Sequence, residues 1–108
     1  NCLVVQDLFR SPLSKRATWC LPAAGFAERN GTWVNRGHRA QTFEQAIRPP
    51  AGVWPEGRVF WSLLGRQGLY DPESIRETIA KNSVGFAALS GDMPSLGVDL
   101  RLQQATGT

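Results

Sequence analysis

The chain has 108 residues, of which 42% are hydrophobic, and carries a formal net charge of +3 at pH 7. This size suits one compact domain or a piece of a larger one, and the hydrophobic content excludes wholesale disorder. Twelve basic residues against nine acidic ones fall short of the dense basic stripe of a nucleic-acid-binding protein. No apolar run approaches the roughly 20 residues of a membrane span. Because the chain starts at Asn1, directly on an apolar run, we expect a piece of a longer protein.

Residues 1–22 predict a strand, a short helix and a second strand. The run "NCLVVQDLF" is short and apolar, as in a parallel strand that is covered on both faces. Ser11 can cap a short helix, and Pro12 suits its first position. The run "TWCLPAA" predicts the second strand, which Pro22 ends. This order predicts two parallel strands joined by a right-handed crossover.

A β-hairpin is predicted next. The runs "TWVN" and "RAQTFEQAI" are rich in residues that favour strands, and they flank Arg36-Gly37-His38. Gly37 is expected to supply the positive φ of the turn. Asn30-Gly31 is a second tight-turn signal just before the hairpin. The following run "RPPAGVWPEG" predicts an irregular connection.

Two helices are predicted in the second half of the chain. The first begins near Pro55 and ends at Gly65 or Gly68, with an apolar stripe at helical spacing formed by Val59, Phe60, Leu63 and Leu64.

The second helix lies in "YDPESIRETIAKNS", where Asp71 caps the first turn, Pro72 starts it, and Ile75 and Ile79 share a face. The tail "GFAALSGDMPSLGVDLRLQQATGT" is expected to be loop-like. We expect a domain over residues 1–102 and a disordered tail over 103–108.

Both cysteines, Cys2 and Cys20, stand in apolar runs. They predict buried, reduced thiols that behave as small hydrophobic residues, and a disulfide between them is the alternative. The sequence contains no C-x-x-C pair and no Cys/His cluster, so it carries no zinc or iron–sulfur motif.

Several residues could serve a site, but a simpler interpretation is favoured for each. His38, the single histidine, is expected in a solvated turn rather than as a catalytic base or ligand contact. Asn30-Gly31-Thr32 matches a glycosylation acceptor but favours a tight turn. Three arginines could form an anion site, but we favour a basic rim that faces solvent or a partner. Four tryptophans could stack on nucleic-acid bases, but we favour a role in the core or at an interface. The residues are Arg36, Arg39 and Arg48 for the anion, and Trp19, Trp33, Trp54 and Trp61 for stacking.

The acidic residues of the second helix, Asp71, Glu73 and Glu77, lie on one polar helix and need no catalytic role. Gly65-Arg66-Gln67-Gly68 follows a helix instead of a strand, so it predicts a helix stop and not a phosphate loop. The residues alone therefore predict a small α/β piece without a self-contained active site.

The stretch from Ala17 to Gly52 resembles the molybdopterin oxidoreductase superfamily. The usual pattern there is A-D-x-x-L-P-A-x-x-x-x-E-x-x-G-T-x-x-N-x-E-G-R-x-Q, followed by A-x-x-P-x-G. Ala17, Ala23, Ala46, Pro49 and Gly52 match this pattern. The matching positions that form the family signature, to which the resemblance gives a structural role, are Leu21, Pro22, Glu28, Gly31, Thr32, Asn35, Arg39 and Gln41.

The nearest resemblance within this superfamily is to the large iron–sulfur subunit, or G chain, of NADH-quinone oxidoreductase (respiratory complex I). The runs "GRVFWSLLGRQG" and "DPESIRETIAKNSVGFAALSGDMPSLGVDL" look like the closing part of that subunit. The resemblance implies a C-terminal fragment of a Rossmann-like parallel-sheet domain with a β-hairpin and two C-terminal helices. A catalytic molybdopterin enzyme of the formate dehydrogenase or nitrate reductase type is the alternative, and a small basic nucleic-acid-binding module is the second.

The resemblance also sets expectations for cofactors, partners and location. It implies electron transfer from NADH to quinone through iron–sulfur clusters elsewhere in the parent, and no catalytic residue, metal or cofactor in this fragment. Partners would be other subunits of a respiratory complex, without nucleic acid or membrane insertion, on the cytoplasmic side of a bacterial inner membrane. The chain departs from the pattern at Thr18, in place of Asp, and at Gly37-His38, in place of Glu-Gly.

Overall fold

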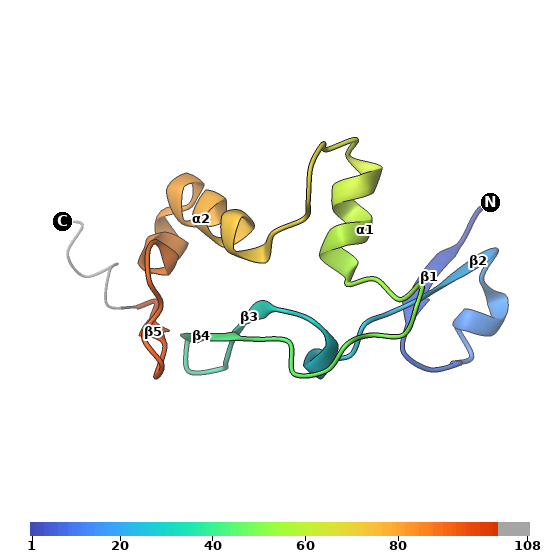
Figure 1. Ribbon diagram of the computed structural model, residues 1–108, viewed down its shortest axis with the longest axis horizontal. Helices are drawn as coiled ribbons and strands as arrows, with labels where there is room; N and C mark the ends of the chain where they lie inside the picture. Colours follow the sequence, from blue (N-terminus) through green and yellow to red (C-terminus); the bar gives the residue numbers. More distant parts are fainter. Residues whose placement is uncertain (102–108) are drawn as a thin grey trace. The chain divides into compact units, whose positions relative to one another are not determined.

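The computed structural model describes residues 1–101. The domain end expected at residue 102 and the tail expected over 103–108 lie outside these described residues. Figure 1 shows the order of the elements along the chain. The chain divides into two compact units, each made of two separate stretches. The first unit contains Asn1–Arg29 and Gln45–Tyr70, and the second contains Asn30–Glu44 and the chain from Asp71 onward.

In the first unit, β1 (Val4–Asp7) pairs in parallel with β2 (Trp19–Pro22), which confirms the predicted parallel pairing. Val4 lies opposite Trp19 and Asp7 lies opposite Pro22. The crossover contains only a short 3₁₀ helix, η1 (Ser14–Arg16). Ser11 and Ser14 hold its start together, because each backbone N–H donates to the hydroxyl of the other residue.

The rest of the first unit contains η2 (Phe26–Glu28) and the helix α1 (Glu56–Leu63). Pro55 stands just before α1, and Gly65 follows it with φ of 65°, as the sequence predicts. An ion pair joins Arg29, after η2, to Glu56 in the first turn of α1.

The apolar stripe predicted on α1 does not form a core. Phe60, Leu63 and Leu64 are exposed, while Trp61 is half-buried and meets Tyr70 edge to face. A helical pattern predicts which residues share a face, but burial depends on a second layer that this unit lacks over that face.

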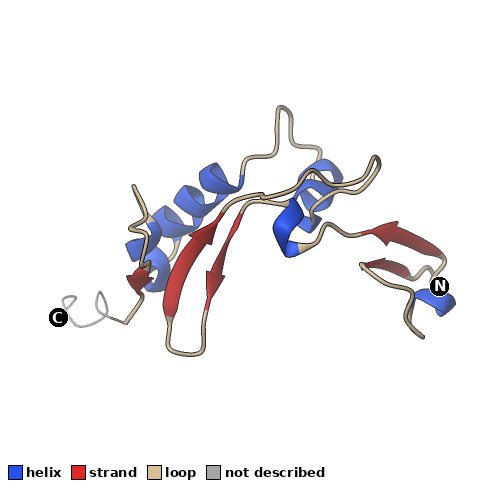
Figure 2. Ribbon diagram, turned by 60° about the horizontal axis from the view of Figure 1, so that its bottom comes forward, coloured by secondary structure: helices blue, strands red, loops and turns tan. Residues whose placement is uncertain are grey.

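In the second unit, β3 (Gly31–Val34) and β4 (Arg39–Phe43) form the predicted antiparallel hairpin. The strand β5 (Val98–Asp99) pairs with the other edge of β4. Figure 2 shows the hairpin as two long red arrows. The turn uses His38 as its left-handed residue, with φ of 62°, so the expectation that Gly37 supplies the positive φ is wrong.

The helix α2 (Pro72–Asn82) begins as predicted, since the Asp71 carboxylate accepts from the backbone N–H groups of Glu73 and Ser74. The predicted apolar face is only partly covered, because Ile79 is exposed. The described part of the segment expected to be loop-like contains two regular elements, η3 (Val84–Leu89) and β5. The core of the second unit combines Leu89 of η3 with Ala40 of β4, Ala80 of α2 and Leu100, which follows β5.

Both cysteine side chains are exposed and free, so the prediction of buried thiols is wrong. Cys2 precedes β1, and Cys20 lies in β2, whose four residues are all exposed or half-buried. Trp19 and Trp33 are also exposed, which contradicts a core role for these two tryptophans. Among residues 1–101, no helix is long and apolar enough to cross a membrane.

Candidate functional site

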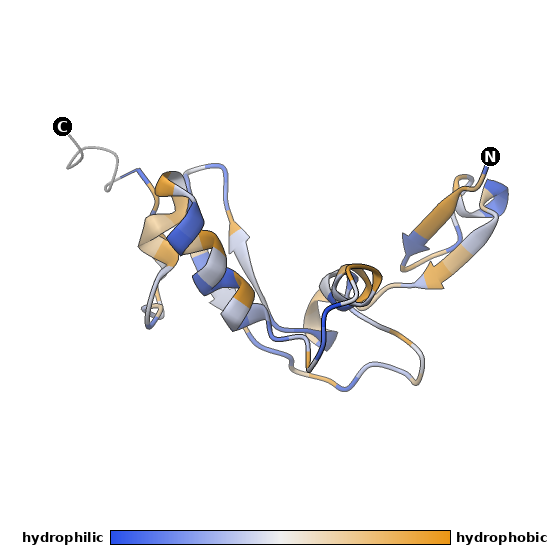
Figure 3. Ribbon diagram, turned by 90° about the horizontal axis from the view of Figure 1, so that it is seen from above, coloured by the Kyte–Doolittle hydropathy of each residue, from blue (hydrophilic) through white to orange (hydrophobic). Residues whose placement is uncertain are grey.

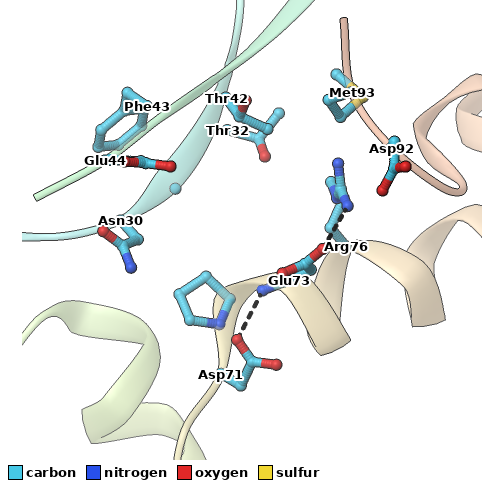
Figure 4. A pocket seen from close by; sticks show the side chains of 12 residues that line it. Asn30, Thr32, Thr42, Phe43, Glu44, Asp71, Glu73, Arg76, Asp92 and Met93 are labelled. Carbon is cyan, nitrogen blue, oxygen red and sulfur yellow. Dashed lines mark hydrogen bonds and ion pairs between the residues drawn. The ribbon is translucent and has the colours of Figure 1, made fainter.

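A pocket of about 410 Å³ opens in the second unit, where the start of α2 meets the β3–β4 hairpin (Figure 4). Its position combines a helix N-terminus with the side chains of two paired strands. The residues that line it are Asn30, Gly31, Thr32, Thr42, Phe43, Glu44, Asp71, Pro72, Glu73, Arg76, Asp92 and Met93.

The hairpin register places two hydroxyls at the pocket. Thr32 lies directly opposite Thr42, so both side chains project from the same face of the sheet. Gly31 lies opposite Phe43, and a Cβ on Gly31 would come within 2.6 Å of the Phe43 ring. The glycine therefore lets the ring lie over the strand, where it stacks on Trp33 with ring centroids 5.6 Å apart.

Arg76 of α2 is the cation of the pocket and is only 7% exposed. Its Nη2 donates to the carbonyl oxygen of Gly91 at 3.1 Å and, at 3.4 Å, to the carboxylate of Glu73. Its Nε is buried without a hydrogen-bond partner. The guanidinium joins α2 to the loop at Gly91 through the hydrogen bond from its Nη2.

Glu77 completes this connection from the next position of α2. One carboxylate oxygen accepts from the backbone N–H of Gly91 at 2.6 Å, and the other accepts from the Ser90 hydroxyl at 2.9 Å. The Gly91 hydrogen bond is the main reason why the pKa of the Glu77 carboxyl lies below its usual value, with smaller contributions from Ser90 and Arg76.

The sequence alone did not single out Arg76. Its spacing of four residues from Ala80 placed both on one helix face, and the structure shows that this is the buried face. The signal in the sequence was therefore a charged residue, Arg76, one helical turn before the small apolar residue Ala80, with the glycine of a loop, Gly91, further along the chain.

The charges of the pocket decide what it can bind. Four carboxylates, those of Glu44, Asp71, Glu73 and Asp92, surround the single guanidinium of Arg76. Such a lining repels anions, so these residues do not fit the phosphates of a nucleotide-like cofactor. Within residues 1–101, no group of three or more His, Cys, Asp or Glu side chains is placed to hold a metal ion.

The residues of the family signature fall in both units. Leu21 and Pro22 line an apolar pocket of about 280 Å³ in the first unit, together with Trp54, whose ring lies 3.9 Å below the Arg58 guanidinium. Glu28 accepts a 2.8 Å hydrogen bond from the N–H of Gly25 and so closes the turn of η2. In the second unit, Gly31 and Thr32 line the polar pocket, whereas Asn35, Arg39 and Gln41 do not.

These last three signature residues lie along the hairpin. The side-chain oxygen of Asn35 accepts from the backbone N–H of Arg39 at 3.0 Å and closes the turn. The guanidinium of Arg39 donates to the carbonyl oxygens of Leu96 and Gly97. Gln41 is exposed and lies opposite Trp33. The arrangement holds the hairpin against the chain that leads into β5.

The other candidates from the sequence are not brought together. Arg36 and His38 are exposed at the hairpin turn, and Arg48 belongs to the first unit. Arg39 uses its guanidinium on backbone carbonyls, as described above. No nucleophile–base pair is formed by the described residues that line the polar pocket.

Comparison with known proteins identifies relatives that are much longer than this chain. The chain is 36% identical over 69 residues to the alpha subunit of an F420-dependent formate dehydrogenase from Methanocaldococcus jannaschii, which covers 64% of the chain and 10% of the relative. It is 35% identical over 102 residues to the alpha subunit of F420-dependent formate dehydrogenase 2 from Methanococcus maripaludis, which covers 89% of the chain and 15% of the relative.

A third relative, a protein of Staphylococcus aureus provisionally named formate dehydrogenase, is 30% identical over 94 residues, or 83% of the chain and 10% of the relative. The chain thus spans 10–15% of the length of the curated relatives it matches. No family model matches the chain, and no solved structure is significantly similar to it. The relatives support the molybdopterin oxidoreductase superfamily and do not point specifically to the complex I G chain.

Proposed function

We propose that this chain is a structural segment of a catalytic molybdopterin oxidoreductase of the formate dehydrogenase type. The observation that carries the proposal is the match to the M. maripaludis relative, at 35% identity across 89% of the chain. The parent would oxidise formate to carbon dioxide, with the release of one proton and two electrons to an acceptor. We therefore prefer the alternative interpretation of the sequence, a catalytic molybdopterin enzyme, to the first one, the G chain of complex I.

In this proposal the segment has a structural role: its side chains fix the helix α2 and the hairpin to neighbouring loops. The polar pocket combines four carboxylates with a buried guanidinium that is engaged by Gly91. The hairpin is fastened through Arg39 to the carbonyls of Leu96 and Gly97. We assign the chemical step to parts of the parent outside residues 1–108.

The large iron–sulfur subunit of complex I is the second candidate. The observation that favours it is the resemblance of the runs around α1 and α2 to the closing part of that subunit. In that case the parent would pass electrons from NADH to quinone and would lie at the cytoplasmic side of the inner membrane. Two relatives are named as alpha subunits, which supports assembly with other oxidoreductase subunits in either case.

The experiment that tests the proposal uses the complete protein that contains this chain. The protein is purified with its co-purifying subunits, its molybdenum content is measured by mass spectrometry, and formate-dependent reduction of an artificial electron acceptor is followed. We expect stoichiometric molybdenum and activity with formate but not with acetate. A preparation that lacks molybdenum and oxidises NADH instead of formate would assign the chain to the complex I subunit.

A further inference from the structure

We draw no further inference here: the strongest candidate, the exposed apolar patch at the C-terminal end of α1, formed by Phe60, Leu63 and Leu64 (hydrophobic colouring on this helix in Figure 3), carries nothing because no feature of the structure shows what covers it.

Discussion

The carboxylate of Glu77 accepts a 2.6 Å hydrogen bond from the backbone N–H of Gly91. The neighbouring Arg76 donates to the carbonyl oxygen of the same glycine. Two oppositely charged side chains of α2 thus hold both polar groups of one loop residue, which adopts φ of 77°. This contact fixes the loop between η3 and β5 against the helix.

The charge of Glu77 should make stability depend on acidity. Its folded-state pKa is lowered from 4.5, so its stabilising contribution is complete above that value and is lost as pH falls through the lower folded pKa. We expect Glu77→Gln to unfold more easily than the wild type at neutral pH and to lose this part of the acid dependence. Urea unfolding at neutral and acidic pH measures both effects. Glu73→Gln, at a more exposed position, is the control, and an unchanged pH profile in Glu77→Gln would contradict the assignment.

The capping residue of α2 offers a second test. The Asp71 carboxylate accepts from two backbone N–H groups of the first turn. Replacement in Asp71→Ala leaves these donors without their partner, and we expect a loss of about 1 kcal/mol in the free energy of unfolding. Asp71→Asn, which can still cap, should lose much less. Equal losses in the two variants would show that the capping hydrogen bonds contribute nothing.

Gly97 is expected to be much less tolerant of a side chain than Gly91. Both have positive φ, but a Cβ on Gly97 would overlap the carbonyl oxygen of Ala40, whereas a Cβ on Gly91 meets no atom within 4 Å. Gly91→Ala should therefore cost only the backbone strain of about 1–2 kcal/mol. Gly97→Ala should cost clearly more, because β5 must move away from β4. Comparable free energies of unfolding for the two variants would argue against the observed approach of the strands.

Asp99 should stay ionised in acid far below the usual range of an aspartate. The Arg101 side chain, which donates to both carboxylate oxygens, is the main reason why the pKa of Asp99 is lowered from 3.8. Its stabilising contribution therefore persists as pH falls through 3.8 and is lost only in stronger acid. Arg101→Ala should raise the pKa of Asp99 towards its usual value, as measured by NMR titration of the carboxylate. Arg36→Ala, at the hairpin turn, should leave the titration unchanged.

Much of the local structure could be predicted from the sequence. Asp71-Pro72 marked the start of α2, Pro55 and Gly65 bracketed α1, and the two apolar runs at the N-terminus gave parallel strands. These features depend on residues that are close together in the chain, where capping, turn geometry and periodicity act directly.

The parts that could not be predicted depend on contacts between distant residues. Arg76 is buried because Gly91, fifteen residues away, accepts its hydrogen bond. The strand β5 forms only because β4 offers it an edge, and nothing in the short run Val98–Asp99 indicates a strand by itself. Cys20 is exposed although its register partner Val5, on the same face of the sheet, is buried. Such outcomes follow from what packs against a residue, which local pattern does not specify.

The alternation of the chain between its two units has a practical consequence for dissection. The polypeptide enters the second unit at Asn30, returns to the first at Gln45 and enters the second again at Asp71. Neither unit can then be produced as one uninterrupted fragment, and a single cut between Glu44 and Gln45 separates the two stretches of both units at once. Expression of either unit alone would require a designed linker between its two stretches. The linker would join Arg29 to Gln45 in the first unit and Glu44 to Asp71 in the second.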